Sequence, residues 1–86
     1  FELDKLFNAQ DYNTVTALAE TVFRIDPYSD IALWYFLNAY HRQKKDDIAM
    51  KKYYLFTAEY SRDMGTEYTY SYQDIIRSDV KDLTGK

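Results

Sequence analysis

The chain has 86 residues, of which 47% are hydrophobic and 19% aromatic, and it carries a formal net charge of -3. This aromatic content excludes an ordinary disordered segment, and the acidic balance argues against a free-standing nucleic-acid binder. The absence of cysteine excludes disulfides, thiol catalysis and zinc–thiolate sites. The longest apolar run, Ile31 to Leu37, is far shorter than the roughly 20 residues that span a bilayer. We therefore expect one folded, cytoplasmic domain over residues 1–86 that makes no contact with a membrane.

A first helical hairpin is predicted over residues 1–27. Apolar side chains at helical spacing predict a helix over Glu2–Asn8, and Asp11 is placed to cap a second helix from Tyr12 to about Ile25. Asp26-Pro27 ends that helix, because the residue before proline avoids helical backbone. The chain starts with Phe rather than Met and its first helix lacks a cap, which indicates a segment excised from a longer protein.

A second, longer hairpin is predicted over residues 28–65. Ser29 is the expected N-cap of a helix that is apolar nearly all round and runs to about Gln43. After a turn, Asp46 is expected to cap a fourth helix, which Gly65 ends in the left-handed conformation that suits glycine. A helix packed on more than one side is the expected centre of a stack.

A capping helix is predicted within residues 71–83, opened by Ser71 and Asp74 at capping-box spacing. It runs from Tyr72 to about Ser78, and its continuation to Leu83 is left open. The two hairpins also repeat each other with a period of about 34 residues. Leu6, Val15, Ala19 and Val22 recur as Tyr40, Ala49, Tyr53 and Phe56. A period of this size, with small residues at a helix crossing, is typical of tetratricopeptide-type repeats. The expected fold is therefore all-α, a tetratricopeptide-like right-handed stack of about five antiparallel helices.

Catalysis is not indicated by any cluster of side chains. His41 is the only histidine and has no partner at ligand spacing, and the chain has no glycine-rich phosphate loop. We therefore expect no enzyme activity, no metal and no cofactor. The run 41–45, with Lys51-Lys52 beyond it, is the one basic patch. It is interpreted as a solvated turn or, alternatively, as a contact with DNA phosphates.

The most plausible ligand surface is one stripe of the third helix, because the first helix of each hairpin lines the groove of such repeats. Asn38 is suited to paired hydrogen bonds with a peptide backbone, Arg42 to a carboxylate, and Trp34 to an anchoring contact. The alternative is that Trp34 is simply part of the core. The candidate partner-binding groove consists of Ile31, Trp34, Asn38, His41 and Arg42.

Two segments carry a resemblance to a known family. The stretch from Asp11-Tyr12 to Asp26-Pro27 looks like the second helix of a tetratricopeptide repeat. The segment from Tyr53-Tyr54 to Gly65, followed by the capped helix at Ser71, resembles the end of the bacterial transcriptional activator domain. In regulators of the antibiotic-regulatory type, that helical domain follows a winged-helix DNA-binding domain.

The resemblance implies a non-catalytic interaction domain of a bacterial transcriptional regulator, which transmits a signal to the winged-helix domain. Its partner would be that domain, another protein or a second copy, and DNA would be reached only through the missing neighbour. The alternative is a generic tetratricopeptide scaffold that binds a peptide or assembles a complex. The sequence upstream of the first residue would separate the two hypotheses.

Overall fold

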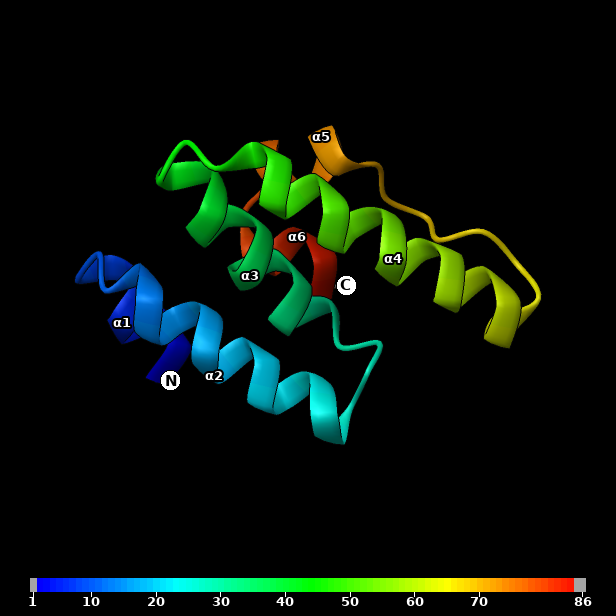
Figure 1. Ribbon diagram of the computed structural model, residues 1–86, viewed down its shortest axis with the longest axis horizontal. Coiled ribbons are helices and arrows are strands. Elements are labelled where there is room, and N and C mark those ends of the chain that lie inside the picture. The colour runs from blue at the N-terminus through cyan, green and yellow to red at the C-terminus, as the bar shows by residue number, and fades with distance from the viewer. Residues whose placement is uncertain (1, 85–86) are drawn as a thin grey trace.

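The computed structural model consists of helices joined by short connections, as the helical spacing of the apolar side chains predicts (Figure 1). The structure describes residues 2–84, so the two ends of the predicted domain 1–86 lie outside the described residues. These residues form six helices and no strand: α1 (Glu2–Asn8), α2 (Tyr12–Ile25), α3 (Asp30–Arg42), α4 (Asp46–Met64), α5 (Tyr72–Arg77) and α6 (Val80–Thr84). The predicted all-α class is therefore confirmed.

The turns after α1 and α3 repeat each other in the backbone. Gln10 and, 34 residues later, Lys44 both adopt the left-handed conformation, with φ of 62° and 60°. The next amide in each turn donates to the carbonyl five residues earlier, at 2.9 Å from Lys45 N to Tyr40 O and at 3.0 Å for the equivalent bond of Asp11. This Schellman closure satisfies carbonyls at the end of the helix. The pairs α1–α2 and α3–α4 thus share their turn geometry as well as their side-chain spacing.

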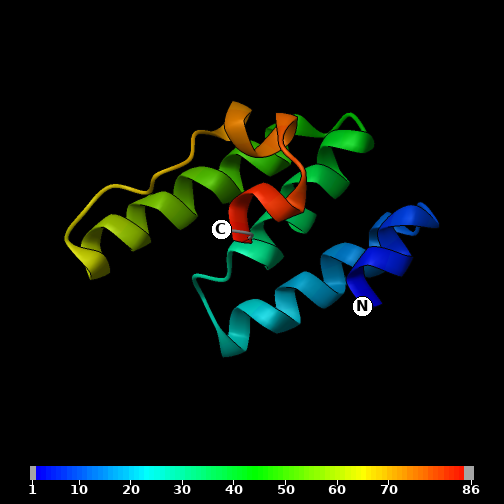
Figure 2. The ribbon, with the colours of Figure 1, turned by 180° about the vertical axis from the view of Figure 1, so that it is seen from behind.

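Helix α3 lies at the centre of the molecule (Figures 1 and 2). Helices α2 and α4 flank it, and α5 and α6 cover the side that is seen from behind. Its residues 32–39 are all buried, and all of them except Asn38 are hydrophobic. Val15, Ala19 and Ala49 are fully buried, and such small side chains let neighbouring helices approach closely. Burial of each large apolar side chain in this core contributes about 1.5–3 kcal/mol.

Most of the predicted helix ends are confirmed. Asp11 and Ser29 accept the capping bonds of α2 and α3, at 3.4 and 3.1 Å. Ser71 and Asp74 form both halves of a capping box, each bond being 3.1 Å long. Gly65 ends α4 with φ of 75°, a conformation that strains other residues.

The prediction that Asp46 caps α4 was wrong. The N-cap position is Lys45, which makes no side-chain capping bond, and Asp46 is the first residue of the helix. Its carboxylate turns away from the helix to His41 and Tyr72. The physical reason is that two side-chain donors compete with the backbone amides for this carboxylate.

The predicted last helix from Tyr72 to about Ser78 is confirmed as α5, but its continuation through the predicted capping segment 71–83, and so the count of about five helices, was wrong. The chain is extended at Ser78, with φ of -91° and ψ of 165°, and α6 starts two residues later. Two carboxylates bond to the backbone at the start of α6: that of Asp79 accepts from Lys81 N at 3.1 Å, and that of Asp82 accepts from Asp79 N at 3.0 Å. A local cap of this kind starts a new helix instead of continuing the old one.

Candidate functional site

Trp34, the predicted anchor, is covered by the C-terminal part of the same chain. Its side chain is 8% exposed, and its indole nitrogen donates to the carbonyl of Ser78 at 3.0 Å. The ring also lies against Phe7 and Tyr35, with centroids 5.2 and 5.0 Å away. The break between α5 and α6 brings the Ser78 carbonyl to the tryptophan, so this residue belongs to the core.

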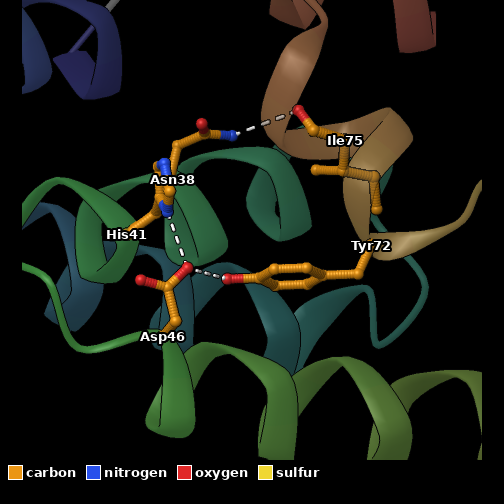
Figure 3. A network of polar contacts seen from close by, with 5 residues as sticks. All are labelled: Asn38, His41, Asp46, Tyr72 and Ile75. Carbon is orange, nitrogen blue, oxygen red and sulfur yellow. Dashed lines mark hydrogen bonds and ion pairs between the residues drawn. The ribbon is translucent and has the colours of Figure 1, made fainter.

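Asn38 is also occupied by the chain itself. It is 3% exposed, and its amide nitrogen donates to Trp34 O at 2.9 Å and to Ile75 O at 3.5 Å (Figure 3). Bonding to a peptide backbone is the role predicted for this side chain, and in the structure the backbone is that of α5. Ile31 is half-buried and packs against the same core. Three of the five predicted groove residues, Ile31, Trp34 and Asn38, therefore contact the chain itself.

His41 belongs to a polar network that joins three helices (Figure 3). Its Nδ1 lies 2.6 Å from Oδ2 of Asp46, and the hydroxyl of Tyr72 donates to the same oxygen at 2.8 Å. The hydrogen bond with His41, followed by that from Tyr72, lowers the pKa of Asp46. Burial, followed by the hydrogen bond to Asp46, raises the pKa of Tyr72 above its ordinary value.

The network holds helices together. The imidazole of His41 and the phenol of Tyr72 both meet the same carboxylate oxygen of Asp46, so three helices are tied at one point (Figure 3). We assign this network the role of fastening α5 to α3 and α4.

Arg42, the last member of the predicted stripe, lies beside a cleft that remains open. Its side chain is exposed, and its guanidinium lies 4.9 Å from the ring centroid of Phe7, in a cation–π contact. The cleft has a volume of about 430 Å³ and is bordered by α1, α3 and the turn between α5 and α6. Its lining includes Asp4, Phe7, Trp34, Arg42, Arg77 and Asp79.

The cleft is lined by two arginines and two carboxylates, and none of the four forms an ion pair within residues 2–84. The carboxylate of Asp4 already accepts a hydrogen bond from the Tyr35 hydroxyl at 3.3 Å, and that of Asp79 accepts the capping bond of α6. Burial, together with both carboxylates, raises the pKa of Tyr35 to about 12. Guanidinium groups over an aromatic floor are suited to bind a carboxylate.

Sequence reasoning missed Arg77 and Asp4 as neighbours of Arg42. Arg77 is the last residue of α5 and Arg42 the last residue of α3. Both positions suit a cation, because the helix dipole favours positive charge there. No local pattern in the sequence places the two helix ends side by side.

The basic patch is divided by the fold. Lys44 and Lys45 form the turn before α4 and are exposed, as is Lys51. Lys52 instead reaches toward α2, where its Nζ lies 4.1 Å from the ring centroid of Phe23. The lysines therefore do not converge on one surface.

Comparison with protein-family models, with curated proteins and with solved structures found no significant match. Within residues 2–84, no three acidic or histidine side chains come together in a group fit to hold a metal ion. Over the same range, every helix is too short or too polar to cross a bilayer.

Proposed function

We propose that this chain is a non-catalytic, cytoplasmic interaction domain of a bacterial transcriptional regulator, and that it modulates an adjacent winged-helix DNA-binding domain. The place in a regulator is supported by the resemblance of residues 53–76 to the bacterial transcriptional activator domain. The tetratricopeptide-like stack is supported by the two helix pairs, whose turns repeat at a spacing of 34 residues. We propose that the domain acts by binding a partner on its surface.

The cleft beside Arg42 is the observation that carries the proposal. It combines two guanidinium groups that form no ion pair within residues 2–84 with an aromatic floor made by Phe7 and Trp34. We propose that it receives an acidic side chain, or a chain terminus, from the winged-helix domain or from another protein. A carboxylate held bidentately by arginine is bound with defined geometry as well as with favourable energy.

Occupation of the cleft would transmit a signal because three parts of the fold border it. Asp4 and Phe7 come from α1, Arg42 from the end of α3, and Arg77 from the end of α5. A ligand that contacts all three favours the arrangement in which α5 is docked. The differential affinity for the docked arrangement sets how far the equilibrium shifts.

The test is to replace both cleft arginines in the full-length regulator, as Arg42→Ala with Arg77→Ala, and to measure affinity for the partner and for operator DNA. Loss of partner binding with retained folding is expected, at about 1.5–3 kcal/mol for each charged hydrogen bond removed. Arg24→Ala, at an exposed arginine of α2 away from the cleft, is the matched control. Unchanged partner affinity and unchanged regulation of DNA binding would refute the proposal.

The same experiment separates the alternative scaffold function. If the chain is a scaffold, Arg42→Ala with Arg77→Ala should abolish peptide binding and leave the affinity for operator DNA unchanged. Direct contact of the basic turn with DNA would instead appear as a loss of DNA affinity in Lys44→Glu with Lys45→Glu, together with a weaker dependence on salt.

A further inference from the structure

Helix α4 carries an exposed apolar face that nothing in residues 2–84 covers. Four of the five large hydrophobic side chains exposed in this part of the chain lie on α4. Three of them share one side of the helix: Ile48, Tyr54 and Leu55 are 40%, 59% and 55% exposed. We define the α4 face as Asp47, Ile48, Lys51, Tyr54, Leu55 and Arg62, all of them exposed. At 3.6 residues per turn, these positions fall within about 120° of arc.

The side of α4 opposite this face packs against the rest of the molecule. Ala49 and Phe56 are buried toward the core, and the Tyr53 hydroxyl donates at 2.7 Å to Tyr70 O in the segment that leads to α5. Lys52 is turned toward α2. The α4 face is thus an apolar centre with a charged rim, which is typical of a surface that binds protein.

The order of charges along this face is complementary to itself. Asp47 lies in the first turn of α4 and Arg62 in the last, and the midpoint between them falls between Tyr54 and Leu55. Two copies placed antiparallel bring Asp47 of each opposite Arg62 of the other, with the two central residues of both copies on the symmetry axis. A parallel pair would set like charges against each other and align the helix dipoles unfavourably.

Arg62 is free to make this contact. Its Nε bonds to Asp63 at 3.2 Å, while its side chain remains 71% exposed and keeps its terminal nitrogens for a carboxylate. Lys51 falls opposite Ala58 of the copy, an exposed small residue that leaves room for the lysine stem. In this register, none of the charged residues of the α4 face lies opposite a like charge of the other copy.

We propose that two copies of this chain associate through the α4 face as an antiparallel, two-fold symmetric pair. The face that self-associates is identical in both subunits, as closed dimers require. The lining of the cleft beside Arg42 includes no residue of α4, so the pair leaves that cleft open. Figure 1 shows α1, which borders the cleft, and α4 on opposite sides of the central helix α3. The proposal therefore stands or falls separately from the function proposed above.

Sedimentation equilibrium of the purified chain over a wide concentration range tests the association. A monomer–dimer equilibrium is expected, and Leu55→Glu should raise the dimer dissociation constant at least about 100-fold, because it places two carboxylates on the axis. Ile25→Glu is the matched control, since Ile25 is 84% exposed but lies at the end of α2. A monomer at every concentration, or equal weakening by both variants, would overturn the proposal. If the chain is monomeric and Leu55→Glu abolishes binding of a different protein, the face belongs to that protein.

Charge reversal tests the pairing. Asp47→Arg and Arg62→Asp should each weaken the dimer about tenfold, because each affects two symmetry-related pairs. The double variant restores the opposite charges and should regain most of the affinity. Additive weakening in the double variant would contradict the antiparallel register.

Cross-linking tests the orientation, since the chain has no native cysteine. Leu55→Cys lies near the axis and should form a disulfide dimer under mild oxidation. Asp47→Cys should not, because antiparallel packing separates the two copies by 15 residues of helix, or about 22 Å. Cross-linking of Asp47→Cys as readily as Leu55→Cys would overturn the arrangement.

Discussion

Ile75→Ala is expected to loosen α5 from the centre of the fold. Ile75 is 0% exposed, and its carbonyl accepts a bond from buried Asn38. The substitution removes three carbon atoms, which corresponds to about 2.4 kcal/mol of transfer free energy, and the cavity left behind brings the loss to about 3–4 kcal/mol. Small domains of this length are stable by about 4–12 kcal/mol, so the free energy of unfolding should fall by roughly a quarter or more.

Urea unfolding measures this loss with two probes. Far-ultraviolet circular dichroism follows all helices, and the fluorescence of Trp34, the single tryptophan, follows the contact with Ser78. Both midpoints should fall, and Trp34 emission should shift to longer wavelength as α5 and α6 leave. Ile25→Ala, the same chemical change at a side chain that is 84% exposed, should alter the free energy by less than about 0.5 kcal/mol. A loss below about 1 kcal/mol in Ile75→Ala would refute the account of how α5 is held.

Two further changes probe the packing and the polar network. Ala49→Leu should destabilise the domain by about 1–3 kcal/mol, because Ala49 is fully buried where α4 crosses its neighbour, while Ala17→Leu at an exposed position of α2 should not. Equal melting temperatures for the two variants would contradict the helix register. Tyr72→Phe keeps the buried ring but removes the 2.8 Å bond to Asp46, which should cost about 1 kcal/mol in chemical denaturation. Because the pKa of Asp46 is lowered in the native state, this carboxylate adds stability that is complete above its unfolded pKa of about 4 and is lost as the pH falls through the native value. Acid titration by circular dichroism should therefore show a shallower decline below about pH 4 in Asp46→Asn, and a decline as steep as in the parent chain would contradict this contribution.

The first four helices could be predicted from features that are local in the sequence. Periodic apolar residues fixed the extents of α1 to α4, and short-range chemistry fixed their ends, as with Ser29 at the start of α3 and Gly65 after α4. The errors occurred where a side chain had two available partners. Asp46 binds His41 and Tyr72 rather than capping α4, and Asp79 caps a new helix rather than continuing α5.

The candidate site depended on contacts that no local pattern specifies. Trp34 reaches Ser78 and Asn38 reaches Ile75 across more than 35 residues of chain, so periodicity showed the stripe but not what covers it. Arg42 was identified because its residue type is suited to a carboxylate. Arg77 was not, because the packing of α5 alone brings it to the same cleft.

The packing of the C-terminal helices onto α3 is tested most directly by nuclear magnetic resonance of the single indole proton. Trp34 gives one indole N–H signal, and that proton is bonded to the carbonyl of Ser78 at an N–O distance of 3.0 Å. Slow exchange with solvent and nuclear Overhauser effects to residues 78–80 are predicted. Rapid exchange, with no such effects, would mean that α5 and α6 do not cover the stripe and that the groove on α3 is open to a partner.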